Sequence, residues 1–306
     1  MSASPRCLLV PLALSLAAAC HSSEISAAGG AGGPASGSPA GAPGNAGGGG
    51  GAGGGTGAGA VGCADALIAL DRSCSMNTMP KGFTKSKYAV AQDVLNALTT
   101  QYQGTMAFGL NAFPPLPSEG TKCDAGKVYA GISLGSAGAI ASAITAIDPS
   151  VKGNMNCGTP TAANLEMLAG YPPLLASGHE HNVILLTDGM PVCSGETVPR
   201  SVAAIERLRS LGVRTFVIGF LAGANQRALD MMAEAGGEPQ PPPAATRYFN
   251  AADPDQLNFS LRKILSRICG EIPPPACPPT APTCGGGTAC PAGTSCASGC
   301  CFPIIQ

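Results

Sequence analysis

The stretch 182–189, NVILLTDG, decides the fold, because its apolar run predicts a strand at the centre of a sheet. Val183–Leu186 is continuously apolar, and a short run of this kind, bounded by a turn signal, is typical of a strand buried on both faces. Asp188 and Gly189 end the run with residues that favour turns. The stretch therefore predicts a strand over 182–187 with an acidic residue directly after its carboxyl end.

Further strand and helix patterns alternate around this strand. Apolar residues spaced three and four apart, such as Val202, Ile205 and Leu208, indicate helices. The predicted strands are 66–70, 106–113, 128–132, 182–187, 213–220 and 247–250. The predicted helices are 86–101, 136–147, 161–168, 198–211, 225–235 and 254–268. This alternation predicts an α/β fold with a doubly wound, mainly parallel sheet and helices on both faces.

The composition divides the chain into four zones. Residues 1–20 carry an apolar stretch behind a single Arg and predict a signal peptide. Residues 21–62 hold 18 of the 43 glycines and one charged residue, so they predict a linker without a core. Residues 63–269 are long enough to bury one core and predict the folded domain. Residues 270–306, rich in Pro, Gly and Cys, predict a tail held by disulfides.

The end of the signal peptide suggests an anchor. The small residues Ala17, Ala18 and Ala19 precede Cys20, and this arrangement resembles a bacterial lipobox. The resemblance implies that Cys20 is lipidated and becomes the first residue of the mature protein. Ala17 departs from the Leu that is usual there, and cleavage near Ala19 in a secreted protein is the alternative. His21, rather than Asp, follows the cysteine, and the resemblance to enterobacterial lipoprotein sorting then implies the outer membrane rather than the inner one.

The overall composition excludes several classes of protein. A net charge of −1 excludes a strongly basic nucleic-acid binder. The longest nearly apolar run, 8–19, is shorter than the ~20 residues that a membrane-spanning helix needs, so we expect no transmembrane helix. The 14 cysteines indicate disulfides and an oxidising compartment.

Polar residues gather where predicted strands end. Asp71, Ser73 and Ser75 follow the strand 66–70 in an Asp-x-Ser-x-Ser pattern, Asp188 follows the central strand, and Thr159 precedes a helix. The carboxyl ends of parallel strands meet at one edge of an open sheet, where ligands bind. Carboxylate and hydroxyl oxygens suit Mg²⁺, Ca²⁺ or Mn²⁺. Glycines at 158 and 189 would permit close backbone approach around this site.

Three segments together resemble a von Willebrand factor type A domain. They are ALIALDRSCSM (66–76), GTPTAANL (158–165) and VILLTDG (183–189), in the order and at the separations that the family shows. The resemblance implies a metal-ion-dependent adhesion site lined by Asp71, Ser73, Ser75, Thr159 and Asp188. It implies Thr159 rather than Thr161 because Thr159 stands six residues before Leu165, and Thr161 then serves the start of the helix. The last ligand in the family is typically a carboxylate of a protein or peptide partner.

The cysteines complete this interpretation. Cys74 stands where the family often has Gly, which suggests a local disulfide. The termini of such a fold usually lie close together, so we expect Cys63 and Cys269 to pair. Cys123, Cys157 and Cys193 join Cys74 in two bridges around the site, with the pairing left open. The tail is expected to form three bridges among Cys277, Cys284, Cys290, Cys296, Cys300 and Cys301, with 15 possible pairings.

The function expected from these features is binding rather than catalysis. We expect a lipid-anchored protein of the cell envelope, at the outer membrane or cell surface, or a secreted one. It would bind a divalent ion and, through it, an acidic group of a partner. Two alternatives stay open: a surface scaffold whose Cys-rich tail is the binder, and a non-catalytic subunit of an enzyme assembly. The segment 179–181, His-Glu-His, could hold a transition metal, but an exposed loop is the expectation.

Overall fold

The computed structural model describes residues 63–178, 180–242 and 244–270, together with 282–283, 290–291, 294–297 and 300–303 of the tail. Six strands form one sheet in the order β3-β2-β1-β4-β5-β6. Only β3 runs antiparallel to its neighbour in this sheet. The strands are β1 (Asp65–Asp71), β2 (Phe108–Phe113), β3 (Lys127–Ser133), β4 (His181–Thr187), β5 (Val213–Phe220) and β6 (Phe249–Ala251). The predicted doubly wound, mainly parallel sheet is confirmed.

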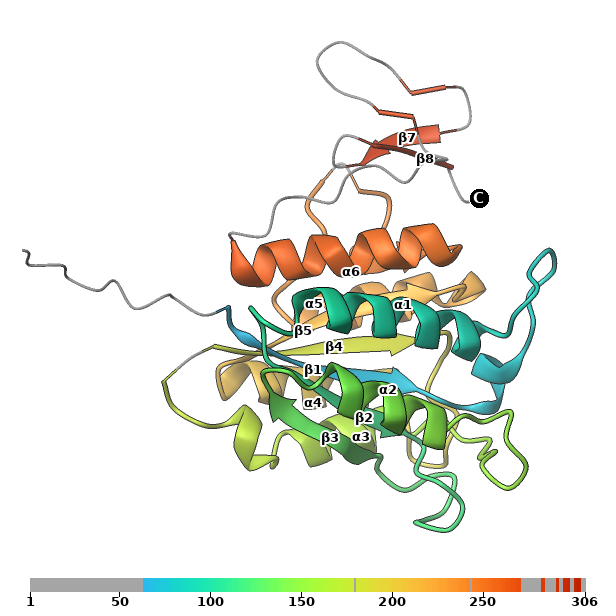
Figure 1. Cartoon of the computed structure of the whole chain (residues 1–306), viewed down its shortest axis with the longest axis vertical. Coiled ribbons are helices and arrows are strands. Elements are labelled where there is room, and N and C mark those ends of the chain that lie inside the picture. The colour runs from blue at the N-terminus through green and yellow to red at the C-terminus, as the bar shows by residue number, and fades with distance from the viewer. Residues whose placement is uncertain are drawn as a thin grey trace, which may run out of the picture. The chain divides into compact units, whose positions relative to one another are not determined.

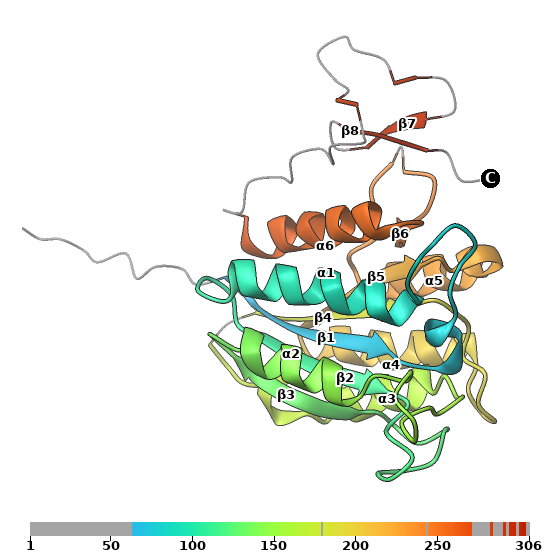
Figure 2. The ribbon, with the colours of Figure 1, turned by 45° about the vertical axis from the view of Figure 1, so that its right-hand side comes forward.

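Helices cover both faces of this sheet (Figures 1 and 2). One core cluster joins the sheet to α1, α2 and α6, and a second joins it to α3, α4 and α5. The helices are α1 (Lys87–Tyr102), α2 (Ala137–Ala146), α3 (Thr161–Leu168), α4 (Val198–Ser210), α5 (Gln226–Ala235) and α6 (Pro254–Cys269). Short 3₁₀ turns lie at Cys74–Asn77, Pro172–Leu174 and Gly223–Asn225.

The apolar run of β1 follows from its place between these two layers. Ile68 and Leu70 belong to the core cluster on one face, and Leu67 and Ala69 belong to the cluster on the other. Successive side chains of a strand point to opposite faces, so a strand that is covered twice has no position for a solvated residue. The first polar side chain after this apolar run is Asp71, which lies at the carboxyl end of the strand, at the edge of the sheet.

The strand order indicates the edge of the sheet at which a ligand would bind. From β1 the chain proceeds to β2 and β3 on one side, and then crosses to β4, β5 and β6 on the other. The boundary between the two directions lies between β1 and β4, whose carboxyl ends point toward the same edge (Figure 1). In open α/β sheets, ligands bind at this topological switch point.

Local signals explain where the helices begin. The hydroxyl of Ser86 accepts a hydrogen bond from the Ala89 amide at the start of α1, and Thr197 accepts one from the Arg200 amide at the start of α4. Asp253 accepts one from the Gln256 amide at the start of α6. Side-chain oxygens at this position satisfy amides that have no partner within the helix.

One loop expectation is wrong. His181 is the first residue of β4 and is buried, with Nε2 2.9 Å from the Ala176 carbonyl oxygen and Nδ1 3.4 Å from Asp65 Oδ2. The strand thus begins one residue before the predicted start, and the pleat turns this ring inward. His179 lies outside the described residues.

Disulfides close the fold. Cys63 and Cys269 are bonded, as expected, and join the segment just before β1 to the end of α6. In the tail, β7 (Thr294–Ala297) pairs antiparallel with β8 (Cys300–Pro303), and Cys290 bonds to Cys301. The expected signal peptide, the lipidation at Cys20 and the linker lie outside the described residues. No helix in the described part of the chain is long and apolar enough to cross a membrane.

Candidate metal centre

Asp71 is the most deeply placed of the five predicted ligands. Its side chain has no exposed surface, and both carboxylate oxygens accept hydrogen bonds. The Ser73 amide donates to Oδ1 at 2.8 Å, and the Thr187 hydroxyl donates to Oδ2 at 2.6 Å. Thr187 ends β4, the strand next to β1, so the register of the sheet brings this donor to Asp71. The two strand ends are thereby joined through one carboxylate.

A chain of hydroxyls continues from this carboxylate to the second one. The hydroxyl oxygens of Ser73 and Ser75 lie 3.0 Å apart, and Ser75 Oγ donates to Asp188 Oδ1 at 2.8 Å. Ser73 and Asp188 are buried, whereas Ser75 is exposed, so the cluster opens to solvent through Ser75. Four predicted ligands, Asp71, Ser73, Ser75 and Asp188, therefore share one polar network.

The charges in this network are unbalanced. Burial, and secondarily the negative charge of Asp188, raise the pKa of Asp71 to about 7, while hydrogen bonds from Thr187 and Ser73 act in the opposite direction. Asp188 Oδ2 receives a hydrogen bond from Lys87 Nζ at 2.7 Å. The network thus holds two carboxylates, of which Asp188 is paired with an ammonium, and an added cation would stabilise this arrangement.

Thr159 approaches the network by a different route. It is buried, and it stands two residues after Cys157, which is bonded to Cys74 between the two serines. The disulfide ties the Thr159 segment covalently to the Asp-x-Ser-x-Ser loop. Among the described residues, the hydrogen bonds of the network do not include the Thr159 hydroxyl.

Arg72 fixes the loops that flank the site. This side chain is fully buried, and burial lowers the pKa of its guanidinium. It donates to the carbonyl oxygens of Ile147 at 2.9 Å, Pro114 at 2.8 Å and Pro115 at 3.0 Å, and also to that of Asn154. The segment from Ile147 to Asn154 leads directly to Cys157. Arg72 therefore positions the approach to Thr159, while Asp71 beside it faces the network.

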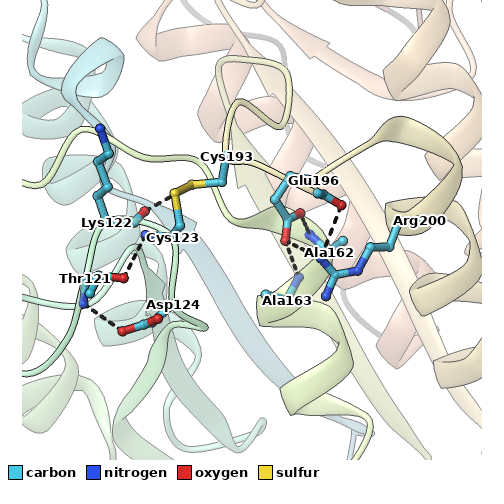
Figure 3. The surroundings of a disulfide bond; sticks show 10 residues. Thr121, Lys122, Cys123, Asp124, Ala162, Ala163, Cys193, Glu196 and Arg200 are labelled. Atoms are coloured by element: carbon cyan, nitrogen blue, oxygen red, sulfur yellow. Dashed lines mark hydrogen bonds and ion pairs between the residues drawn. A yellow bond between two sulfur atoms is a disulfide. The ribbon is translucent and has the colours of Figure 1, made fainter. Parts of the chain in front are cut away.

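A second disulfide joins two loops that follow the carboxyl ends of strands. Cys123 bonds to Cys193, which joins the loop after β2 to the loop after β4 (Figure 3). Gly158 fits beneath this bridge, because a Cβ there would lie 1.7 Å from the Lys122 carbonyl oxygen. The expected close approach at Gly158 is confirmed. At Gly189 it is wrong, because a Cβ there would meet nothing within 4 Å.

The start of α3 is capped by a residue that the sequence did not single out. Glu196 accepts hydrogen bonds from the amides of Ala162 at 2.6 Å and Ala163 at 3.0 Å, and Arg200 Nη1 lies 3.1 Å from its carboxylate (Figure 3). The Thr161 hydroxyl, expected to serve this helix start, is buried without a hydrogen-bond partner. A carboxylate interacts better with several amides at a helix start than a hydroxyl does.

The donor set fits a hard divalent cation. Two carboxylates and two hydroxyls lie within one network, and a third hydroxyl, that of Thr159, is tethered beside it. Oxygen donors of this kind suit Mg²⁺, Ca²⁺ and Mn²⁺, whereas Zn²⁺ sites usually contain Cys or His. In the part of the chain that the structure describes, no three His, Cys, Asp or Glu side chains cluster as a metal site. Hydroxyls supply the remaining donors here.

Comparison with protein families agrees with the fold. The profile of the von Willebrand factor type A domain matches residues 65–264. This match begins at the first residue of β1 and ends within α6, so it includes the whole sheet. No curated protein matches the sequence.

Solved structures show the same fold at low sequence identity. The pilus adhesin SpaC of Lactobacillus rhamnosus GG is 15% identical, with a TM-score of 0.52, over 69% of this chain and 30% of that chain. The PilB minor pilin of Streptococcus sanguinis is 16% identical, with a TM-score of 0.51, over 69% of this chain and 62% of that one. The chain thus spans less than two thirds of either protein, and the likeness concerns the fold.

Proposed function

The chain belongs to the von Willebrand factor type A domain family, and from this premise we propose that it is a cation-dependent binding protein of the cell envelope. Asp71, Ser73, Ser75, Thr159 and Asp188 would hold the ion, with Mg²⁺ as the first candidate and Ca²⁺ or Mn²⁺ as alternatives. The bound ion would supply a coordination position for an acidic group of a protein or peptide partner. The chain's own residues orient the donors and exclude water from the buried side.

One observation carries this proposal. The Ser75 hydroxyl donates to Asp188 Oδ1 at 2.8 Å, across 113 positions of sequence. This contact brings the loop after β1 to the loop after β4, and the hydroxyl chain from Ser73 continues it toward Asp71. Residues from two separate motifs, the Asp-x-Ser-x-Ser loop and the loop after β4, thereby meet at the switch point of the sheet, where ligands of this fold class bind.

Disulfides support an extracytoplasmic location. Cys63–Cys269, Cys74–Cys157 and Cys123–Cys193 are bonded within the α/β domain, and disulfides persist mainly in oxidising compartments. Together with the lipobox-like end of residues 1–20, this favours attachment through a lipid on Cys20, followed by the linker 21–62. A secreted form, cleaved near Ala19, is the alternative.

A binding role is favoured over an enzymatic one. Cys74 and Cys193, the cysteines nearest the network in sequence, are both bonded and offer no thiol nucleophile. The described histidine, His181, begins β4, whereas Asp188 follows its end, so this ring lies at the opposite edge of the sheet. A catalytic pair of nucleophile and base therefore has no candidate among these residues. A subunit of an enzyme assembly and a scaffold with a binding tail stay as alternatives.

Calorimetric titration with MgCl₂ tests the cation site. Asp71→Ala removes an oxygen donor and the acceptor that joins β1 to β4, so we expect Mg²⁺ binding to be lost while far-ultraviolet circular dichroism is retained. Asp93→Ala is the matched control, because Asp93 is exposed and pairs with Lys85 away from the network. Undiminished Mg²⁺ binding by Asp71→Ala would refute the assignment.

Partner binding is tested separately. Proteins retained by the immobilised chain in the presence of Mg²⁺ would be released by a chelator, and Asp71→Ala would not retain them. Deleting 270–306 would leave this retention intact. Loss of retention on deletion, with no effect of the chelator, would favour the scaffold whose tail binds.

A further inference from the structure

Lys87 is a charged residue at the candidate site that the von Willebrand motifs do not include. It is the first residue of α1, and its Nζ lies 2.7 Å from Asp188 Oδ2. The Lys87 side chain is 14% exposed and that of Asp188 is 1% exposed, so solvent screens this ion pair poorly. The pair lies in the site itself, not on a solvated helix face.

The Lys87 ammonium binds a carboxylate oxygen of Asp188 that a metal ion at this site would need as a ligand. Ser75 donates to Asp188 Oδ1, and Lys87 donates to Oδ2, so both oxygens of this carboxylate are engaged. Among the described residues, Lys87 is the only Lys or Arg within ion-pair distance of Asp188 or Asp71. Arg72, next to Asp71 in sequence, instead directs its guanidinium to backbone carbonyls of the flanking loops.

A divalent ion at Asp188 and an ammonium on the same carboxylate repel each other. This repulsion is strong, because the two positive charges would lie a few ångströms apart in a poorly solvated site. The flexible four-carbon stem of Lys87 allows its ammonium to move away from the site. Asp188, in contrast, directly follows β4 and is buried, so its carboxylate stays in place. Cation binding at this site would therefore replace the Lys87 ammonium on Asp188 with a divalent metal ion.

We propose that Lys87 is a tethered counter-ion, which neutralises Asp188 until a divalent cation displaces it and which thereby sets the cation affinity of the site. This inference rests on the proposed cation site. It explains how a buried carboxylate pair is tolerated before an ion binds, since an unpaired buried charge is strongly destabilising. It also predicts that the ammonium becomes more accessible when the ion is bound.

Cation affinity is the first test. Lys87→Met keeps the apolar stem and removes the charge, so Mg²⁺ no longer has to displace an ammonium. We expect calorimetry to give a dissociation constant at least about tenfold lower than that of the wild type, the scale of one charged hydrogen bond. Lys87→Arg keeps the charge and is expected to bind no more tightly than the wild type. Lys85→Met is the matched control, because Lys85 pairs with the exposed Asp93 and should leave the affinity unchanged.

Accessibility of the ammonium is the second test, and it needs no variant. Brief acylation of the wild type with an amine-reactive ester, followed by mass spectrometry, measures Lys87 and Lys85 in the same sample. Mg²⁺ is expected to raise the modification of Lys87 several-fold and to leave that of Lys85 unchanged. This readout still tests the proposal if Lys87→Met fails to fold.

The outcomes separate this inference from the proposed function. Mg²⁺ binding by the wild type, with equal or weaker binding by Lys87→Met, would overturn the counter-ion role and leave the cation site intact. Unchanged acylation of Lys87 on addition of Mg²⁺ would also overturn it. Absence of Mg²⁺ binding in both the wild type and Lys87→Met would overturn the cation site and the inference together.

Discussion

The amino and carboxyl ends of the neighbouring strands β1 and β4 carry different combinations of ionisable side chains. At the amino end, Asp65 of β1 stands in register with His181 of β4, and the Asp65 carboxylate lies 3.4 Å from the imidazole. At the carboxyl end, Asp71 ends β1 and Asp188 follows β4, so a carboxylate faces a carboxylate. The amino end thus pairs a carboxylate with an imidazole, whereas the carboxyl end brings two carboxylates together.

This difference supports the proposal that the carboxyl end of the two strands binds the ligand, whereas the amino end only stabilises the fold. Burial, and secondarily the negative charge of Asp188, raise the pKa of Asp71 to about 7, so ionised Asp71 is costly at this end of the sheet. A fold selected for stability alone would avoid such a pair, as β1 and β4 do at their amino ends. Disulfides follow the same division: Cys63–Cys269 closes the chain at the amino end of β1, whereas Cys74–Cys157 and Cys123–Cys193 join loops around the carboxylates.

The largest effect expected is from removing one disulfide at each end. Cys63→Ala with Cys269→Ala opens a link with a sequence separation of 206, and Cys74→Ala with Cys157→Ala opens one of 83. Loop-closure entropy predicts a loss of about 5 kcal/mol in the free energy of unfolding for either pair, measured by urea denaturation. Only the second pair tethers Thr159, so only its loss is expected to weaken Mg²⁺ binding strongly in calorimetry.

Equal Mg²⁺ affinities in the two double variants would contradict this division. That result would mean that Cys74–Cys157 stabilises the chain in the same general manner as Cys63–Cys269, without placing the Thr159 segment. Stability measured in the same buffer controls for a general loss of folded protein.

A smaller effect is expected at Glu196, which caps α3 beside the site. Glu196→Gln removes the charge from a side chain that is 1% exposed and that accepts from two helix amides, so we expect a loss of about 2 kcal/mol in urea denaturation. Glu166→Gln is the control: Glu166 pairs with the same Arg200, but its side chain is 43% exposed, and its loss is expected to cost under about 1 kcal/mol. Equal losses would show that the cap carries no more than a surface ion pair.

The strands were predictable from local patterns, whereas several partners at the site were not. The apolar run of β1 and the run before Asp188 are both buried on two faces of the sheet. Because burial on both faces requires an apolar residue at every position, the amino-acid types alone indicate these strands. Thr187 could have been found, because the parallel register of β1 and β4 places it beside Asp71. This inference needs the pairing of the strands in addition to their pattern.

No pattern in the local sequence indicated the contacts that Glu196 and Lys87 make. Glu196 caps a helix 33 positions earlier, and Lys87 contacts an aspartate 101 positions later. A charged residue near a helix start is usually solvated, so nothing in the local sequence distinguishes these two from the exposed Lys85 or Glu166. Their roles arise only when the packing of α1, α3 and the loop after β4 brings the elements together.

The smallest effect expected is at Ser86, and it tests the link between α1 and the carboxyl end of the sheet. Ser86 caps α1 through the Ala89 amide, and Lys87 is the next residue. Ser86→Ala is expected to cost about 1 kcal/mol in urea denaturation and to fray the first turn, which carries the ammonium. Because a loosened Lys87 holds Asp188 less firmly, Mg²⁺ affinity should rise slightly as stability falls. Thr197→Ala removes an equivalent cap from α4, with the same 3.2 Å hydrogen bond, and should lower stability without raising the affinity. A general loosening of the domain would weaken cation binding in both variants. A lower stability together with a higher Mg²⁺ affinity in Ser86→Ala alone is therefore specific to a site whose own lysine competes with the ion.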